Sequence, residues 1–271
     1  MNSLTVAGVV LVLSAVLSCG CRRSYPTPNS PLLPAQFLTR TVVVGGKPRL
    51  YTVYLPPGYG PQARWPVILS LHGSGECGTD GVLPSQGGLG TELRQRPERF
   101  PCVVIFPQTS QHLHYWTDDF DLALTALKQT VREFHGDPKR LYLTGYSLGG
   151  SGTWFLAAKH PDLFAALAPI CGRIAVRPER ARDPLIHRLV TLRNPYAAVA
   201  SRIGKTPVWV FHGADDPIIP VAQSRRIAAA LKAQHGDVRL TVYPGVGHGA
   251  WPLAYDDPNL PRWLLAHRLK K

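Results

Sequence analysis

LTGYSLGG, residues 143–150, is the stretch of sequence that decides the fold. Ser147 stands in it between Gly145 and Gly149, which gives the pattern Gly-x-Ser-x-Gly. The pattern is typical of a sharp strand-to-helix turn, because glycines two residues on either side of the serine remove Cβ atoms that would otherwise collide. A β-rich run precedes it and a helical run follows it, as the turn requires. We therefore predict that Ser147 is a nucleophile at the C-terminal edge of a sheet, rather than part of a purely structural glycine turn.

The sequence on either side alternates between strand-like and helix-like runs. Short apolar runs, typical of buried strands, lie at 66–71, 102–106, 140–144, 164–170, 207–211 and 238–243. Runs with helical spacing lie at 118–135, 150–159, 221–234 and 259–269. This alternation predicts a single α/β domain in which helices cover both faces of a mostly parallel sheet.

Two regions depart from the alternation. Strand-like runs at 41–44 and 49–55 are separated by Gly45 and Gly46, which is a hairpin signal, so we expect an antiparallel N-terminal edge. Residues 172–204 are rich in Arg and Pro and show no clear period. We expect them to form a cap or an irregular excursion near the site.

The serine needs a base, because a hydroxyl is a poor nucleophile on its own. His248 lies in the glycine-rich loop 245–251, directly after the last predicted strand. This position matches the chain order serine, acid, histidine, and predicts His248 as the general base. A turn histidine is the alternative, and the sequence does not exclude His112 and His114, which lie in a loop near the sheet edge.

The acid is expected after a strand between these two residues. Residues 211–220, FHGADDPIIP, supply Asp215 and Asp216. One of them would hold the imidazole in its productive tautomer and stabilise the imidazolium, while the other would cap the turn.

The oxyanion of a tetrahedral intermediate needs preorganised N–H donors. We expect one from the amide of Leu148, the residue after the nucleophile. The other is expected from the amide of Ser74, in the loop LHGSGE at 71–76 that follows a predicted buried strand. A simple glycine turn is the alternative for this loop.

Three aromatic residues lie in loops that follow strands, where pockets of α/β proteins form. Tyr115, Trp116 and Trp251 could bind an aromatic or sugar ring by stacking, and we predict Trp116 and Trp251 as substrate contacts. The alternative is that these rings only pack the loops.

From about residue 38 to its end, the chain resembles the bacterial α/β hydrolases known as predicted peptidases or poly(3-hydroxybutyrate) depolymerase-like esterases. The loop at 71–76, the Ser147 turn, PVWVFHG at 207–213 and the segment 243–251 carry this resemblance. It implies the α/β-hydrolase fold and carboxylesterase activity, including feruloyl and acetyl-xylan esterases. It also favours Asp216 over Asp215, since such hydrolases often show His-Gly-x-x-Asp-x-x-(Val/Ile)-Pro.

The sequence departs from the resemblance at one position. Cys77 stands where an Arg is familiar after Gly-Glu, so no role is carried over to it. Dienelactone hydrolases share the fold but use a Cys nucleophile, and Ser147 disfavours that relationship.

Composition narrows the classes of partner. The 271 residues carry a formal net charge of +13, but no run of five or more basic residues and no nucleic-acid motif accompany it. We therefore expect a solvated basic surface and no nucleic-acid partner. The five cysteines form no CxxC pair and no zinc-type spacing, so neither a metal nor another cofactor is predicted.

The N-terminal residues predict export. The apolar run at 4–17 is shorter than the roughly 20 residues of a transmembrane helix and suits a secretory signal. We expect a signal at 1–21, with Cys19 or Cys21 lipidated as in a bacterial lipoprotein, a Pro-rich linker at 22–37 and the hydrolase domain at 38–271. The protein would then be periplasmic or anchored to a membrane. The positive charge expected before the run is missing, so an uncleaved apolar tail or a misassigned start is the alternative.

Together these features predict a serine hydrolase that cleaves carboxylic esters by two-step acyl transfer. Its substrate would be a small-molecule ester or one linked to a polysaccharide, such as a feruloyl or acetyl ester. One alternative is a peptidase that uses the same residues. Another is a surface lipoprotein that binds sugar or polymer without catalysis.

Overall fold

The computed structural model describes residues 34–110 and 116–270. Contacts divide the chain into residues 1–31 and 32–271, and every described residue belongs to the second unit. The predicted signal, most of the linker, and the lipidation candidates Cys19 and Cys21 lie outside the described residues. The same holds for His112, His114 and Tyr115.

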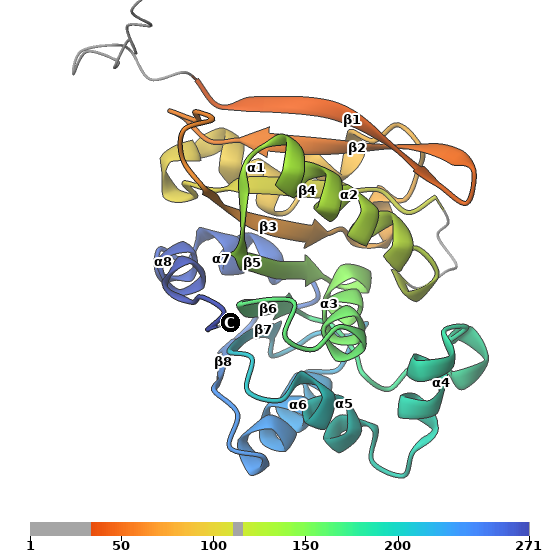
Figure 1. Cartoon of the computed structure of the whole chain (residues 1–271). Helices are drawn as coiled ribbons and strands as arrows, with labels where there is room; N and C mark the ends of the chain where they lie inside the picture. Colours follow the sequence, from red (N-terminus) through yellow and green to blue (C-terminus); the bar gives the residue numbers. More distant parts are fainter. Residues whose placement is uncertain (1–33, 111–115, 271) are drawn as a thin grey trace, which may run out of the picture. The chain divides into compact units, whose positions relative to one another are not determined.

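An eight-stranded sheet forms the centre of the domain, in the order β1-β2-β4-β3-β5-β6-β7-β8 (Figure 1). The strands are β1 (Gln36–Val44), β2 (Lys47–Leu55), β3 (Trp65–Leu71), β4 (Val103–Pro107), β5 (Gly136–Tyr146), β6 (Ala166–Ile170), β7 (Val208–Gly213) and β8 (Val238–Tyr243). Neighbours from β4 to β8 are parallel, whereas β1 pairs with β2, and β2 with β4, in antiparallel fashion. The predicted antiparallel edge is confirmed, although β1 begins two residues before the predicted start of the domain.

The hairpin between β1 and β2 follows from its two glycines. Gly45 and Gly46 have φ of +57° and +74°, a region that other residues adopt at a steric cost. Two consecutive positive φ values match the right-handed twist of the flanking strands, so the hairpin closes with a two-residue turn.

Helices cover both faces of the sheet (Figure 1). They are α1 (Leu89–Gln95), α2 (Phe120–Glu133), α3 (Leu148–Lys159), α4 (Pro184–Thr191), α5 (Pro195–Ile203), α6 (Ala222–Ala233), α7 (Trp251–Asp256) and α8 (Asn259–Ala266). Alternate strand residues enter two separate cores: Val67 and Leu69 pack with helices α2 to α6, and Ile68 packs with α1, α7 and α8. Burial on both faces explains the continuous apolar runs in the sequence. This is the α/β-hydrolase fold.

Residues 172–204 are more regular than predicted. They contain two helices, α4 and α5, where the expectation was a cap or an irregular excursion. The Asp183 carboxylate accepts hydrogen bonds from two amides at the start of α4, and the Asn194 side chain accepts one at the start of α5. Each capping residue is followed by a proline in the first turn of the helix. A capping side chain followed by proline marks the start of a helix, and the spacing of apolar residues does not reveal it. Both helices bury apolar residues in the core beside α3.

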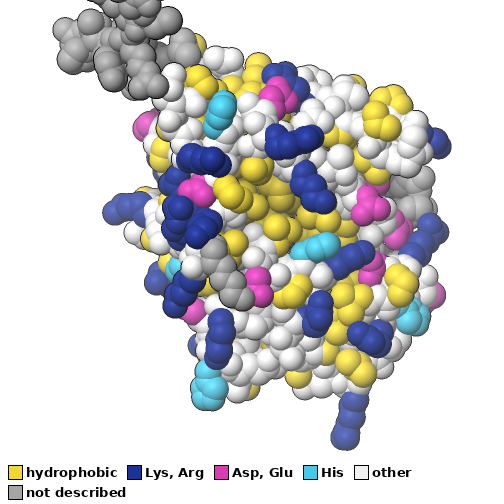
Figure 2. Space-filling model, in the orientation of Figure 1, with side chains coloured by type: hydrophobic (Ala, Val, Ile, Leu, Met, Phe, Trp, Pro, Cys, Tyr) yellow, Lys and Arg dark blue, Asp and Glu magenta, His cyan; other side chains and the backbone are white. Residues whose placement is uncertain are grey.

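The surface shows no single basic patch on the face drawn in Figure 2, where Lys and Arg side chains are dispersed among other residues. Within the described ranges, no helix combines the length and the apolar character needed to cross a membrane.

Candidate active site

The turn between β5 and α3 places Ser147 at the carboxyl end of the sheet. Ser147 has φ of 54° and ψ of −113°, a conformation that costs free energy for a residue with a side chain. The main chains meet here without side chains between them: a Cβ on Gly145 would lie 2.4 Å from the Gly149 carbonyl oxygen, and one on Gly149 would lie 2.0 Å from that of Leu71. The two glycines of the motif are therefore required by close packing against β3.

The three residues predicted to act together lie in one hydrogen-bonded row. His248 Nε2 lies 2.8 Å from Ser147 Oγ, and His248 Nδ1 lies 2.7 Å from Asp216 Oδ2. They come from the carboxyl ends of β5, β7 and β8, although 101 positions separate serine and histidine. With Nδ1–H donating to the carboxylate, Nε2 is left to accept the serine proton.

The structure distinguishes the two aspartates. Asp216 is buried, and its Oδ1 accepts hydrogen bonds of 2.8 Å from the amides of Ile218 and Ile219. Burial by itself raises the pKa of Asp216, but the hydrogen bonds from His248 and from these amides outweigh it and lower the pKa below its usual value. Asp215 is exposed, and its amide hydrogen-bonds to Val246. The position of Asp216 agrees with the choice made by resemblance.

A second histidine lies behind the carboxylate, and the sequence argument assigned it no role. His212 is fully buried; its Nε2 lies 3.1 Å from Asp216 Oδ2 and 2.8 Å from the Ile219 carbonyl oxygen. Its Nδ1 lies 2.7 Å from Ser224 Oγ. Burial lowers the pKa of His212. The neutral ring therefore donates from Nε2 and accepts from the Ser224 hydroxyl. The signal in the sequence was a histidine four residues before the acid.

The two predicted oxyanion donors lie at the same end of the sheet. Leu148 is the first residue of α3, where amides have no partner within the helix and the helix dipole favours negative charge. Ser74 begins a short 3-10 helix (Ser74–Glu76), which two residues separate from the end of β3. Both amides thus belong to segments that begin just beyond the carboxyl ends of β3 and β5, and their role as oxyanion donors stays a prediction.

His72 holds the root of the Ser74 loop. Its Nδ1 lies 2.6 Å from the Gly73 carbonyl oxygen, and its Nε2 accepts a 3.1 Å hydrogen bond from the Thr109 amide. Burial lowers the pKa of His72 to about 4. The ring is therefore neutral at pH 7, with both nitrogens engaged in fixed roles.

The predicted substrate contact of Trp116 is wrong. Trp116 has 0% of its surface exposed, because its ring packs edge-on to His72 with centroids 4.8 Å apart. Its indole N–H donates to the His72 carbonyl oxygen at 3.0 Å. It therefore supports the loop from below and has no face for a ligand.

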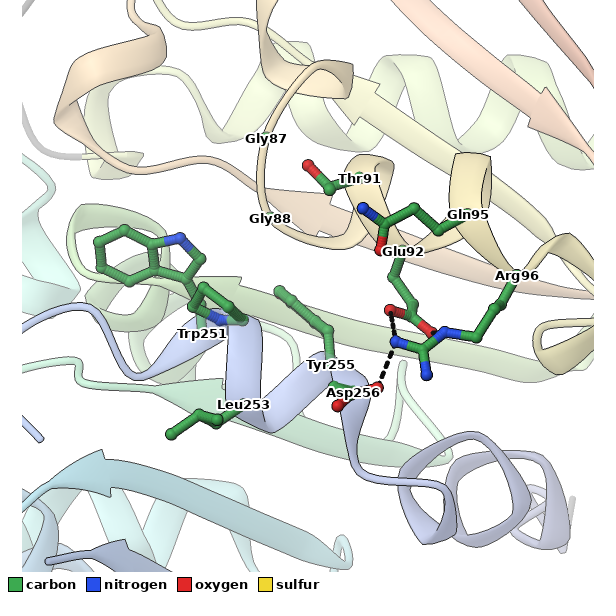
Figure 3. Close-up of a pocket in the computed structure, with 11 residues that line it drawn as sticks. Gly87, Gly88, Thr91, Glu92, Gln95, Arg96, Trp251, Leu253, Tyr255 and Asp256 are labelled. Atoms are coloured by element: carbon green, nitrogen blue, oxygen red, sulfur yellow. Dashed lines mark hydrogen bonds and ion pairs between the residues drawn. The ribbon is translucent and has the colours of Figure 1, made fainter.

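Trp251 remains a candidate substrate contact. It is half-buried, stacks on Tyr146 with ring centroids 4.7 Å apart, and meets His248 edge-on. It also lines a cavity of about 410 Å³ between α1 and α7, shown in Figure 3, which we name the α1–α7 groove. Trp251 stands at one end of this groove and the ion pair of Arg96 with Asp256 at the other.

One group of donors among the described residues has the spacing of a metal site. Atoms of Cys171, Asp216 and His248 lie within 4.8 Å of one another. However, the carboxylate and the imidazole already bond to each other, and burial raises the pKa of the Cys171 thiol to about 12, so it is protonated at neutral pH. This chemistry suits the serine network better than a metal ion.

Comparisons with known proteins show that the chain is similar to esterases in sequence and in fold. The chain is 26% identical to NocK of Nocardia uniformis subsp. tsuyamanensis over 73% of its own length and 54% of NocK. It is 29% identical to feruloyl esterase B of Neurospora crassa, over 46% of this chain and 44% of that protein. The chain thus spans about half the length of these relatives. Among solved structures, a thermostable esterase superposes with a TM-score of 0.67 at 30% identity, covering 86% of this chain and 63% of the other.

A family model settles the relationship. The model of the dienelactone hydrolase family matches residues 98–252, more than half of the chain. The match overturns the expectation that Ser147, in place of a Cys nucleophile, disfavours this family. The nucleophile is a single residue, whereas the match extends from before β4 to α7. The predicted relationship to ester-cleaving α/β hydrolases is confirmed, and the chain belongs to the dienelactone hydrolase family.

Proposed function

We propose that this chain is a serine carboxylic ester hydrolase that works through an acyl-enzyme. The row of hydrogen bonds from Ser147 through His248 to Asp216 is the observation that carries the proposal. A hydroxyl, an imidazole and a buried carboxylate in this order form the arrangement that activates a serine for acyl transfer. The esterases among the similar proteins support the same reaction class.

In the first half-reaction, Ser147 Oγ attacks the ester carbonyl carbon while His248 Nε2 takes its proton. The Leu148 and Ser74 amides are proposed to stabilise the oxyanion. When the intermediate collapses, the C–O bond to the alcohol breaks and His248 gives the proton to the leaving oxygen. Water then attacks the acyl-enzyme with the same base, and the acid and free serine are released.

The proposed substrates are a class of esters, which includes esters of phenolic acids. Feruloyl esterase B among the relatives supports esters of phenolic acids, and the groove beside Trp251 offers room for a carbohydrate or aromatic group. Acetyl esters of carbohydrates are included in the proposal. We further propose that the protein is exported and anchored through Cys19 or Cys21, which rests on the apolar run at 4–17.

The test compares labelling by a fluorophosphonate probe with hydrolysis of p-nitrophenyl butyrate. We expect Ser147→Ala to abolish labelling and to lower kcat by about 10⁴-fold or more. Ser201→Ala is the matched control, because Ser201 is exposed on α5, and it should retain both. An unlabelled wild-type protein without esterase activity would favour the noncatalytic sugar-binding alternative. Faster cleavage of short peptides than of any ester would favour the peptidase.

A further inference from the structure

Two buried oxygen atoms beside the nucleophile make no well-aligned hydrogen bond with any of the described residues. They are the hydroxyl of Tyr146, whose side chain is 4% exposed, and Oε2 of Glu76. Tyr146 immediately precedes Ser147, and Glu76 ends the 3-10 helix that begins at Ser74. Buried polar atoms without partners destabilise a fold, so they are rare unless a ligand or solvent completes them.

The two oxygens face the same small space. A Cβ built on Gly73 would lie 3.2 Å from Glu76 Oε2 and 2.8 Å from the Tyr146 ring. A Cβ on Gly87 would lie 3.6 Å from the Tyr146 hydroxyl and 3.8 Å from Glu76 Oε1. Burial raises the pKa of Tyr146, and the charge of Glu76 together with a side-chain contact to that carboxylate raises it further. The phenol therefore stays protonated, and its nearest acceptor is Glu76, which lies at poor hydrogen-bond geometry.

This space adjoins the α1–α7 groove. Gly87 and Gly88 line the groove, and Figure 3 shows them on the turn opposite Trp251. A Cβ on Gly88 would lie 2.6 Å from the Tyr146 ring, so only a glycine main chain separates the ring from the groove at this point. A turn of two glycines can shift to admit a small group, since glycine has the fewest conformational restrictions.

The charges around the groove favour a neutral ligand. Glu92 pairs with Arg96 and with Arg99, at 3.0 and 2.5 Å, and Asp256 pairs with the same two arginines. These ion pairs leave little net negative charge to select a cation. A ligand hydroxyl also fits both oxygens, because it donates to a carboxylate while its own oxygen accepts from a phenol. An ammonium group can only donate, so it would leave the Tyr146 proton to its poorly aligned contact with Glu76.

We propose that Glu76 and Tyr146 together bind a hydroxyl group of the ester substrate, and so select hydroxylated esters over their plain analogues. The proposal rests on the proposed ester hydrolysis and assigns its substrate class. The hydroxyl belongs either to the alcohol or to the acyl part of the ester, and the bond it makes is the same in both cases. Glu76 and Tyr146 are specificity-determining residues, which leave the bond-breaking steps at Ser147 unchanged.

The test measures kcat/KM by pH-stat for two pairs of esters. Glycerol monoacetate against propyl acetate places the hydroxyl in the alcohol, and methyl 3-hydroxybutyrate against methyl butyrate places it in the acyl group. The wild-type protein should prefer the hydroxylated member of one pair by at least about tenfold, as expected for hydrogen bonds that include a charged acceptor. The responding pair identifies which part of the substrate reaches the site.

Three variants should remove this preference by different routes. Glu76→Gln removes the charged acceptor, and Tyr146→Phe removes the donor while it keeps the ring stacked on Trp251. Gly87→Ala keeps both groups and places a methyl at van der Waals distance from them. Each should bring the ratio within about twofold of unity, since the lost bonds account for the preference. Tyr243→Phe is the control, because the Tyr243 hydroxyl is also buried without a described partner but is not among the groups that face Gly73 and Gly87.

The outcomes separate this proposal from the proposed function. A wild-type ratio near unity for both pairs overturns the hydroxyl site, as does a preference that persists in both Glu76→Gln and Tyr146→Phe. An equal loss of rate for both members of a pair also overturns it, because that pattern indicates a structural role. If instead no ester is hydrolysed, or Ser147→Ala hydrolyses them all as fast as the wild type, then the serine hydrolase itself is refuted.

Discussion

The two sides of Ser147 differ in how completely their polar atoms are paired. On one side, a continuous row of hydrogen bonds joins Ser147, His248, Asp216, His212 and Ser224. On the other side, the Tyr146 hydroxyl and a Glu76 oxygen make no well-aligned hydrogen bond with the described residues. A closed network fixes the positions of its members, whereas unpaired groups retain the capacity to bind something else. We infer that the first side serves the chemistry and the second the choice of substrate.

The closed side should fail most severely at its carboxylate. Asp216→Asn should lower kcat for p-nitrophenyl butyrate by roughly 10⁴-fold, because an amide neither stabilises the imidazolium nor fixes its tautomer. Asp215→Asn, one residue away but exposed, should stay within about twofold, as surface changes usually do. Similar losses in the two variants would contradict the assignment of the acid. Steady-state kinetics at pH 8 decide the matter.

On the side of Ser147 that carries Glu76, the buried His72 fixes the start of the loop. We expect the stability of the fold to depend on pH through this histidine. The pKa of His72 is about 4 in the fold, below the value of about 6.5 for an unfolded histidine. Between these two pH values the unfolded chain therefore binds more protons than the folded chain. The contribution of neutral His72 to the free energy of unfolding is thus fully present above pH 6.5 and is lost as the pH falls toward 4. The expected loss is roughly 3 kcal/mol of unfolding free energy by pH 4.

Urea unfolding between pH 7 and pH 4 measures this loss. His72→Gln is the matched variant, because its amide oxygen can accept from the Thr109 amide in place of Nε2 and does not titrate. The variant should lose less stability than the wild type over the same interval. Parallel losses in the two proteins would assign the acid sensitivity to other groups, such as His212, whose pKa burial also lowers.

A smaller effect is expected from the far end of the closed network. His212→Asn removes the donor to Asp216, and Ser224→Ala removes the hydroxyl that fixes the ring. We expect kcat to fall about tenfold in the first variant and about threefold in the second, in line with the loss of one or two hydrogen bonds. In an Asp216→Asn background the His212 change should cost much less, because both residues act through the same carboxylate. Fully additive losses would argue against a positioning role.

The smallest effect separates the paired from the unpaired polar groups. Tyr142 and Tyr146 both lie in β5 and are both buried, but only the Tyr142 hydroxyl makes a well-aligned hydrogen bond, to the His267 carbonyl oxygen at 2.8 Å. Tyr142→Phe should lower the unfolding free energy by about 1 kcal/mol, whereas Tyr146→Phe should leave it unchanged or raise it. Thermal unfolding of the two variants side by side measures this. A clear drop for Tyr146→Phe would show that its hydroxyl is paired after all.

Local patterns predicted the parts of the fold that local forces decide. The Ser147 turn was recognisable because main-chain crowding demands glycines at fixed spacing, and the order of serine, acid and histidine placed His248 near it. The edge hairpin followed from Gly45 and Gly46 in the same way. These features are determined by residues that are close in sequence or by the order of motifs along the chain, so they can be predicted without knowing the tertiary contacts.

Features that depend on tertiary packing were missed or misread. Trp116 was expected to contact substrate because it follows a strand, but burial is decided by what packs on it, here the loop at His72. His212 was noticed only as part of a motif, since its hydrogen bond to Ser224 depends on how α6 packs against β7. The Tyr146 and Glu76 pair depends on two segments that lie 70 positions apart in the sequence. No local pattern announces such a pair.

The glycine contacts beneath Ser147 have a consequence for how the protein can diverge. Since β3, β5 and α3 contact one another through their main chains, the position of Ser147 does not depend on which side chains fill either core. The walls of the groove come from other segments, at 87–96 and 251–256. Substitutions in those short segments, whether natural or from a directed library, can therefore change the substrate specificity while the catalytic residues keep their positions.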